Sequence, residues 1–505
     1  MKFFNKKTIS AGLLSTVLLL SACTDLVDGF STDPVNPTDP SVISTENFAA
    51  GMLMNLIGTY EADISRLTGM WAGYFSGEDR QYIGLANYGV SGRDFDTEWG
   101  GIYSNVIKNA TIVKSRAKDS KNAWMTGLAQ AAEAMGAGLA ADLWGDVPYS
   151  EMAQYPAIST PKYDAQADVY AKVQVLLDSA IANFSVDAAS IPNKLQSEVA
   201  NADFYFSGDT DAWIAVCHTL KARFYLHTRN YTDAITEALQ GIQTADGNME
   251  APHGTSYLQN FNLYYSFTNY DRPGYMGANS YAPALIDRAV DGSRNNAKTI
   301  EDGRLNYLYL PGAGVYISGA YEPNFVNYAD GWGTPDPSWD GFFGIETSFP
   351  MVTYQENQLI LAEAYAKTGD SPSALGALND YRQYLNGGGY LNGAYKDPAN
   401  YESLYAPYDA TDFDNGGIEN EDGIDPDDAL LREILEERYV TFIGQLEGYN
   451  DIRRTGNFLN IPVKTGNTTM PLRLLYSQGE INTNPNVPKT GVGLFDPTPV
   501  NSTPY

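Results

Sequence analysis

The stretch ARFYLHTRNYTDAITEAL, residues 222–239, has a second copy further along the chain at residues 362–379, AEAYAKTGDSPSALGALN. Four positions are identical: Ala222, Tyr225, Thr228 and Ala234 in the first copy, and Ala362, Tyr365, Thr368 and Ala374 in the second. Each copy predicts a helix, a break at Arg229-Asn230 or Gly369-Asp370, and a second helix that opens with small residues. Small residues at this spacing let two paired helices approach closely.

This repeat resembles the tetratricopeptide helix pair, whose units stack to bury one shared core. Two unrelated helix hairpins of similar composition are the alternative. Apolar residues at helical spacing predict further helices outside the two copies, and they extend the helical pattern over most of the chain. The predicted ranges, copies included, are 45–60, 99–118, 123–143, 169–184, 212–227, 232–242, 352–367, 373–385 and 429–447.

Residues 259–349 have a different character, because they are rich in Gly, Pro, Asn and Tyr and show few clean periods. The sequence therefore predicts a mostly α fold. A helix-pair scaffold of the tetratricopeptide type spans about 41–258 and 350–505, and an irregular, loop-rich, ligand-binding lobe spans about 259–349 plus 68–95. We expect 41–505 to form a single domain.

The N-terminus has the pattern of an export signal. Three lysines at positions 2, 6 and 7 precede an apolar run over 9–20, which is shorter than the roughly 20 residues that span a bilayer. Residues 1–22 are therefore predicted to be a signal peptide, and Leu-Ser-Ala-Cys at 20–23 predicts lipidation of Cys23. An ordinary signal peptide with an incidental cysteine is the alternative. Three prolines within 24–40 predict a flexible tether over 23–40.

Charge excludes one class of partner. The chain has a formal charge of -29, and removal of 1–22, with its three lysines and no acids, takes the charge to -32. A body this acidic repels phosphate backbones, so we expect no nucleic-acid partner. It also disfavours strongly anionic glycans. Once Cys23 is lipidated, Cys217 is the only thiol left, so no intrachain disulfide is expected.

The sequence shows none of the common catalytic motifs. The three histidines, His218, His227 and His253, have no zinc-ligand spacing, and the chain has no Gly-x-Ser-x-Gly elbow and no phosphate loop. The acidic stretch 409–428 opens like a calcium loop, but its closing position falls on Gly423 instead of Glu. We therefore expect no metal site and no cofactor, with adventitious calcium as the alternative. A binding protein is favoured over an enzyme. A surface glycoside hydrolase stays as the less favoured alternative, because two carboxylates suffice for that chemistry.

Several segments together resemble one family. They are ADLWGDVPYSE (141–151), WGGIYSNVIKNA (99–110), KARFYLHTRNY (221–231), EDGRLNYLY (301–309), LREILEERYVTFIGQLEGYNDIRRTG (431–456) and MPLRLLYSQGEINTNPNVP (470–488). In order and spacing they are similar to the SusD/RagB family of Bacteroidetes outer-membrane lipoproteins, in particular to its starch-binding, outer-membrane-associated branch. The resemblance implies a lipid-anchored protein facing the cell exterior. It also implies a role as the lid of a SusC-like TonB-dependent transporter, capturing oligosaccharides or, in some members, peptides.

The shared motifs need not form the ligand site. Gly-Asp-Val-Pro is turn chemistry, so Trp144, Asp146 and Tyr149 are interpreted as structural. In the 431–456 segment, charged residues are expected to pair within the scaffold: Glu436, Arg438, Asp451, Arg453 and Arg454.

A sugar ring offers an apolar face and a polar rim, so flat aromatics beside amides, carboxylates or Arg are its natural complement. Such side chains cluster in the loop-rich segments, where binding residues concentrate. The residues predicted to contact ligand are Trp71, Tyr74, Arg80, Tyr82, Tyr88, Tyr264, Tyr275, Trp332 and Trp339. Trp99, Trp124 and Trp213 follow helical patterns and are predicted core residues. Glycan capture and peptide capture both stay open as functions of this lobe.

Overall fold

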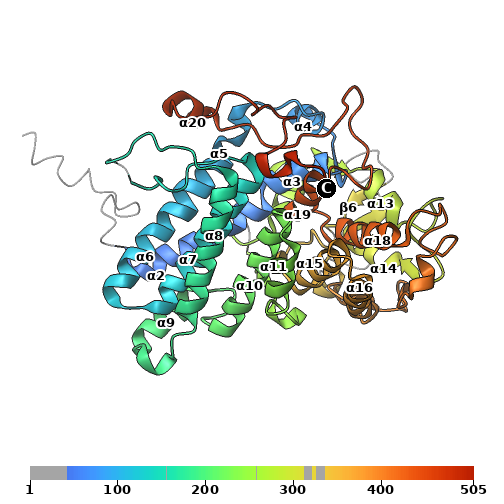
Figure 1. The fold of residues 1–505 in the computed structure, drawn as a ribbon, viewed down its shortest axis with the longest axis horizontal. Coiled ribbons are helices and arrows are strands. Elements are labelled where there is room, and N and C mark those ends of the chain that lie inside the picture. The colour runs from blue at the N-terminus through green and yellow to red at the C-terminus, as the bar shows by residue number, and fades with distance from the viewer. Residues whose placement is uncertain (1–42, 155, 257–258, 312–320, 326–335) are drawn as a thin grey trace, which may run out of the picture.

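A computed structural model describes residues 43–505, except 155, 257–258, 312–320 and 326–335. The predicted signal peptide, Cys23, the tether and Trp332 lie outside the described residues. Within them, no helix combines the length and the apolar character that a membrane span requires. The fold is mostly helical, as predicted (Figure 1).

The first layer of the scaffold consists of α2 (Thr45–Glu61), α6 (Lys108–Ser120), α7 (Ala123–Trp144) and α8 (Gln166–Phe184), which lie side by side in Figure 1. Their starts follow from capping, as where the Asn122 side chain accepts a hydrogen bond from the Met125 N–H. The central helix α7 is buried on nearly all sides, and its many alanines allow its neighbours to approach closely.

The predicted repeat forms two helix pairs, α10 (Thr210–His227) with α11 (Tyr231–Ala238), and α15 (Tyr354–Lys367) with α16 (Ser371–Asn386). Both pairs turn in the same way. Arg229 and Gly369 occupy matching positions with φ of 61° and 79°. The next residue then caps the second helix, Asn230 by accepting from the Asp233 N–H and Asp370 from the Ser373 N–H. Since α11 also packs on α15, the two copies share one core.

The single helix expected over 429–447 is instead two helices, α18 (Pro426–Thr441) and α19 (Leu446–Arg454). The break lies at Gly444, whose φ of +80° ends a right-handed helix and is strained for other residues. Its carbonyl accepts a hydrogen bond from the Tyr264 hydroxyl at 2.7 Å, and a side chain there would collide with Phe343. The helix expected over 99–118 runs as α5 (Asp96–Gly100), a wider π-helical stretch η3 (Gly101–Ile107) and α6.

Sequence periodicity missed several elements. Helix α3 (Asp63–Trp71) has only nine residues and is buried at every position from Ile64 onward, polar Ser65, Arg66 and Thr68 included, so its residue types do not reveal that it lies in the core. The remaining helices of four or more residues are α4 (Arg80–Ala86), α9 (Asn193–Ala202), α12 (Leu263–Ser266), η6 (Phe267–Asp271), α13 (Tyr281–Ile286), α14 (Asp302–Leu308), α17 (Gly393–Lys396), α20 (Gln478–Thr483), η2 (Gly92–Phe95) and η9 (Pro499–Ser502). Single turns occur at η4 (Ala188–Ser190), η5 (Ala245–Gly247), η7 (Pro337–Trp339) and η8 (Ala410–Asp412).

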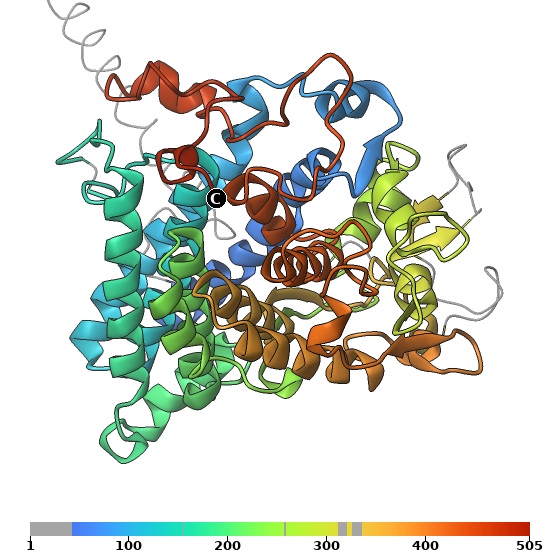
Figure 2. The ribbon, with the colours of Figure 1, turned by 45° about the vertical axis from the view of Figure 1, so that its right-hand side comes forward.

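Short antiparallel strand pairs fasten the loop-rich segments to distant parts of the chain. The pairs are β1 (Phe75–Gly77) with β3 (Met276–Ala278), β2 (Met249–Ala251) with β7 (Phe349–Val352), β4 (Thr299–Glu301) with β8 (Ser403–Tyr405), and β5 (Tyr309–Pro311) with β6 (Tyr321–Pro323). The first pair joins the two segments, 68–95 and 259–349, that the sequence assigned to one lobe. In Figure 2 the yellow-green lobe segments lie on the right, and the orange-to-red C-terminal helices lie between them and the N-terminal layer.

Buried ion pairs tie the lobe to the scaffold. The Arg304 guanidinium contacts the Glu437 carboxylate of α18 at 2.5 Å, and Arg294 contacts Glu433 of the same helix at 2.7 Å. Glu301 bridges the two arginines from the lobe side. Removing one partner of such a group leaves an uncompensated buried charge, which costs roughly 3–5 kcal/mol. The lobe is therefore held in a defined orientation against α18.

Candidate ligand-binding site

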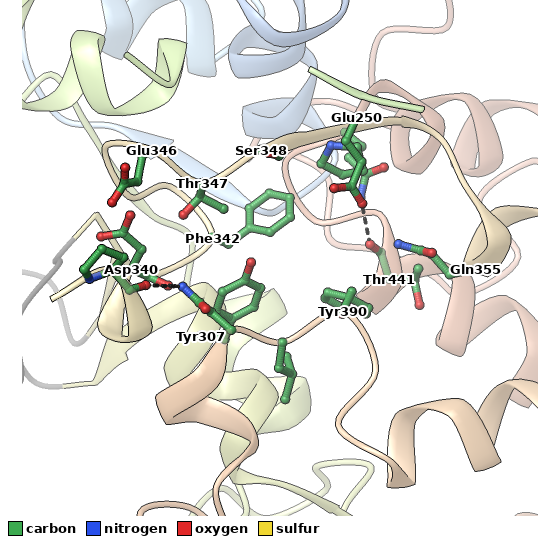
Figure 3. A pocket seen from close by; sticks show the side chains of 15 residues that line it. Glu250, Tyr307, Asp340, Phe342, Glu346, Thr347, Ser348, Gln355, Tyr390 and Thr441 are labelled. Atoms are coloured by element: carbon green, nitrogen blue, oxygen red, sulfur yellow. Dashed lines mark hydrogen bonds between the residues drawn. The ribbon is translucent and has the colours of Figure 1, made fainter. Parts of the chain in front are cut away.

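A cleft of about 340 Å³ opens where the lobe meets the scaffold (Figure 3). This volume lies at the lower end of the range of small-molecule sites in proteins. Its walls come from segments that are far apart in sequence: Glu250, Tyr307, Pro337, Asp340, Phe342, Glu346, Thr347, Ser348, Pro350, Gln355, Tyr390, Leu391, Asn392, Thr441 and Gln445. We call this hollow the lobe cleft.

Local backbone structure holds the walls in place. The turn η7 begins with Asp336, whose side chain accepts from the Ser338 N–H, and it delivers Asp340 to the cleft. The Asn392 amide then donates to the carbonyls of Pro337 at 2.6 Å and of Asp340 at 3.2 Å. The opposite wall follows from strand β7, which pairs with β2 and carries Pro350 opposite Glu250.

Aromatic side chains lie in the middle of the lobe cleft. The Tyr307 ring meets Phe342 edge-on, with centroids 5.8 Å apart, and lies 6.2 Å from the Tyr390 ring. The Tyr390 hydroxyl is buried beside the Arg304 guanidinium, which can only donate to it, so the Tyr390 O–H has no acceptor among the described residues. Burial raises the pKa of Tyr390 to about 12, so the hydroxyl is protonated and available to donate at neutral pH. Tyr307 and Phe342 are each only 4% exposed, so Tyr390 supplies most of the ring surface that a ligand could reach, together with its hydroxyl.

Carboxylates lie at both ends of the lobe cleft. Figure 3 shows Asp340 and Glu346 on one side of the aromatic residues and Glu250 on the other. Burial raises the pKa of the Asp340 carboxyl to about 7; the Glu346 N–H opposes this rise, and the Glu346 charge adds to it. Burial also raises the pKa of Glu250, against the effect of the Asn248 amide that donates to it. The described lining residues include no lysine, arginine or histidine.

Two predicted ligand contacts, Trp71 and Tyr74, belong to the core instead. Trp71 is the last residue of α3 and only 1% exposed, with its indole N–H donating to the Leu85 carbonyl. Tyr74 is fully buried, and its hydroxyl donates to the Tyr439 carbonyl. These rings have no free face for a sugar. The glycines next to them do not mark an open loop; they allow neighbouring side chains to pack closely.

Other predicted residues gather in one place, though away from the lobe cleft. Tyr82 and Tyr275 are buried and meet edge-on at 6.0 Å, and the exposed Arg80 guanidinium lies 5.7 Å from the Tyr275 ring. Tyr264 is buried, and its hydroxyl bonds Gly444 as described above. Tyr88 is also buried, and its hydroxyl accepts from the Lys464 N–H.

Trp339 is the predicted residue that comes nearest to the lobe cleft. It is half-buried in turn η7, immediately before Asp340, and its ring packs against Tyr395. Trp332 lies outside the described residues. Apart from Trp71 and Tyr74, whose rings are enclosed in the core, ligand contact by the predicted residues stays a prediction.

The three aromatic residues of the lobe cleft, Tyr307, Phe342 and Tyr390, were not among the predicted contacts. One signal could have pointed to Tyr390, since three consecutive glycines precede it and mark an irregular loop. Tyr307 lies in a predicted family motif. No local pattern shows that these three rings meet, because they come from separate segments of the fold.

A larger hollow of about 590 Å³ lies between η3, the 148–161 loop and α20. Its wall includes Trp99, which is a core residue as predicted and packs on Trp144. Several polar groups of this wall already have partners; for example, Asp96 accepts from the Ser477 hydroxyl at 2.6 Å, and none of its described lining residues has a buried polar side-chain atom without a partner. The lobe cleft, with unpaired polar atoms, is the better candidate for a ligand site. Trp213 is also buried as predicted, whereas Trp124 is only half-buried.

The predicted structural roles of the shared motifs are confirmed in the main. The Trp144 indole N–H donates to the Leu475 carbonyl, Asp146 accepts from the Gln166 N–H, and the Tyr149 hydroxyl donates to Glu133. Within 431–456, ion pairs join Arg438 to Asp451 and join Arg454 to Asp451 and Glu363. Two expectations are wrong: Arg453 donates to backbone carbonyls instead, and Glu436 makes no ion pair with a described residue.

Groups that could suggest catalysis have structural surroundings. His227 is 3% exposed and lies between the carboxylates of Asp142 and Glu447, at 2.7 and 3.0 Å. Cys217 is buried, and burial raises the pKa of its thiol well above the usual range. In the acidic stretch, Asp412 contacts Lys298 at 2.6 Å. The described residues contain no group of three His, Cys, Asp or Glu side chains arranged to hold a metal ion.

Comparison with known proteins places this fold in a family. Residues 37–477 match the model of a SusD-like family described as starch-binding and associating with the outer membrane. The chain belongs to this SusD-like family. No curated protein sequence matches it.

Solved structures show the same fold as this SusD-like protein. A SusD/RagB family protein from Bacteroides thetaiotaomicron is 22% identical, with a TM-score of 0.63 over 92% of this chain and 98% of the other. A chitin-binding SusD homolog from Flavobacterium johnsoniae is 17% identical, with a TM-score of 0.61 over 91% and 98%. A SusD homolog from Parabacteroides distasonis is 16% identical, with a TM-score of 0.66 over 92% and 99%. At these identities the likeness shows the fold, and the ligand must be argued from this chain's own residues.

Proposed function

We propose that this SusD-like protein is a cell-surface lipoprotein, anchored through Cys23, that captures oligosaccharides. In this proposal the lobe cleft holds the sugar, and the protein delivers it to a SusC-like TonB-dependent transporter of the outer membrane. The observation that carries the proposal is the composition of the cleft, where Tyr307, Phe342 and Tyr390 lie between hydrogen-bonding side chains. Aromatic rings cover the apolar face of a sugar, and the surrounding polar groups bond its hydroxyls.

The names of relatives indicate which sugars to test first. The family description names starch, and one structural relative is named as chitin-binding. Starch-derived and chitin-derived oligosaccharides are therefore the first ligands to examine. Capture of peptides on the same scaffold is the alternative, and it would rely more on bonds to the peptide backbone than on ring stacking.

Titration calorimetry with a panel of glycans and peptides tests the proposal. We expect at least one glycan to bind, and we expect Tyr390→Ala to weaken that binding by about tenfold or more, equivalent to roughly 1.4 kcal/mol. Tyr270→Ala is a matched control, because Tyr270 is an aromatic residue outside the cleft and 44% exposed. Binding of peptides alone would contradict glycan capture. Shorter products accumulating in the glycan samples would point to the hydrolase instead of a binding protein.

Anchoring and delivery need separate tests. Cys23→Ala should release the protein from the outer-membrane fraction if the cysteine carries the lipid. The wild-type protein should copurify with a TonB-dependent transporter from detergent-solubilised outer membranes. Equal membrane retention of both forms would contradict anchoring through Cys23.

A further inference from the structure

The charged side chains that line the lobe cleft are all acidic, and this affects which sugars can bind there. Its described walls contain three carboxylates, Glu250, Asp340 and Glu346, and no basic side chain. Most acids elsewhere in the buried parts of the chain are paired with arginine, as Glu437 is with Arg304. The carboxylates of the cleft thus differ from the structural carboxylates, because the fold provides no cation to balance them.

Asp340 is the most unusual of the three. It is 1% exposed, and neither carboxylate oxygen has a hydrogen bond of normal geometry among the described residues, although the Glu346 N–H lies near enough to oppose the rise in its pKa. The fold nevertheless holds it in place, through the turn that precedes it and the Asn392 amide that donates to its carbonyl. A buried polar group without a partner is costly, so such groups in native proteins call for a ligand, an ion or a water.

The groups around Asp340 do not supply that partner. The charged and titratable groups that influence it are Glu346 and Asp336, both acidic, and Asp340 in turn acts on the hydroxyls of Tyr307 and Tyr395. The Tyr395 hydroxyl donates to the Trp339 carbonyl instead. None of the described side chains neutralises the Asp340 carboxylate, so a ligand donor that tolerates a second carboxylate nearby would suit this position.

We propose that the lobe cleft selects oligosaccharides that carry a free amino group, such as glucosamine units, through the carboxylates of Asp340 and Glu346. This inference rests on the proposed glycan function of the same cleft. An ammonium group has three N–H donors and a positive charge, and its hydrogen bonds to carboxylates are about twice as strong as those of neutral donors. An N-acetylated unit has a single neutral N–H, and an acidic sugar would add a further negative charge. Tyr390, the one ring of the three that is not buried, offers a flat apolar face that a sugar ring matches better than an alkyl chain does.

A matched set of ligands isolates the amino group. Three β-1,4-linked tetramers, of glucosamine, of N-acetylglucosamine and of glucose, differ only in the substituent at carbon 2. Calorimetry of the purified protein at pH 7 should show the glucosamine tetramer binding about tenfold or more tightly than the other two. Asp340→Asn should reduce this preference to within about threefold, and Glu346→Gln should weaken it in the same direction. Asp291→Asn is the control, since Asp291 is exposed and outside the cleft.

Each outcome has a defined meaning. Equal affinity for the three tetramers, binding of other glycans but none of these, or a preference that survives Asp340→Asn would each overturn the inference while leaving glycan capture intact. Tighter binding of a trilysine peptide than of the glucosamine tetramer would overturn it in favour of a peptide ligand. Absence of binding to every glycan in the wider panel would instead refute the proposed function itself. A thermal unfolding midpoint for each variant, measured in parallel, separates loss of binding from loss of fold.

Discussion

Replacing Asp340 with asparagine should stabilise the protein at alkaline pH, although it removes a charged residue from a binding cleft. Burial holds the pKa of the Asp340 carboxyl at about 7, against an ordinary value of 3.8. The folded protein therefore binds a proton that the unfolded chain has released between pH 4 and pH 7. Stability falls as the pH rises through this window, and above pH 7 the ionised carboxylate destabilises the fold.

The magnitude follows from the shift. A rise of about 3 pKa units corresponds to roughly 4 kcal/mol at about 1.36 kcal/mol per unit. Because Asp340 borders an open cleft, water screens part of this cost, and about 2 kcal/mol is the expected value. Asp340→Asn should come closest to the wild type near pH 4, at the start of this window, where the carboxyl is protonated in the folded protein and only partly ionised in the unfolded chain. It should exceed the wild type by about 2 kcal/mol at pH 8.5.

Urea unfolding followed by circular dichroism at the two pH values measures this difference. Other groups also titrate, so the quantity that matters is the variant minus the wild type at each pH. Asp291→Asn, which removes an exposed carboxylate outside the cleft, is the control variant measured at the same pH values. A gap between Asp340→Asn and the wild type that stays constant from pH 4 to pH 8.5 would refute the reasoning.

Three further changes test the scaffold. Trp71→Ala should cost about 3–5 kcal/mol of unfolding free energy as a core truncation, and calorimetry should then show that any protein still folded binds glycan as the wild type does. Burial alone would lower the pKa of His227, but the Asp142 and Glu447 charges raise it from 6.5 to about 9. The protonated His227 therefore stabilises the fold fully below pH 6.5, and this contribution to the free energy of unfolding is lost as the pH rises through 9. The stability deficit of His227→Gln should therefore shrink by about 3 kcal/mol between pH 6 and pH 9.5, and a constant deficit in denaturant titrations would contradict this. Gly369→Ala should cost about 1 kcal/mol from its φ of +79° alone, because open space surrounds the site, and a loss above about 3 kcal/mol in the same assay would show that another contact is involved.

Periodicity and the repeat were enough to predict the helical scaffold. Segments 222–239 and 362–379 form two helix pairs with the same turn. This could be predicted because a turn of this kind is determined by a few neighbouring residues. Helix α3 was missed because it is short and buries polar Ser65, Arg66 and Thr68, so its burial depends on tertiary packing that the local sequence does not show. Trp71 was consequently assigned to a loop, and its surroundings of glycine suggested exposure where the structure has close packing.

The binding cleft could be predicted only in part. The sequence indicated a loop-rich segment with aromatic and acidic residues, and Trp339 and Asp340 do lie together at the edge of the cleft. Tyr307 and Tyr390, by contrast, are 83 positions apart in the numbering and meet only through tertiary packing. Contacts of this kind depend on how the lobe is oriented against α18, and no single stretch of sequence determines that orientation.

The position of Trp339 gives the protein a built-in optical probe. Four of the other tryptophans, Trp71, Trp99, Trp144 and Trp213, are buried in the core, where a ligand in the cleft leaves their surroundings unchanged. Trp339 is half-buried and precedes Asp340 directly. Its indole emission should respond when a charged or polarisable group enters beside Asp340, so the cleft can be followed by intrinsic fluorescence without a label, and stopped-flow mixing can then time how quickly a sugar arrives and leaves.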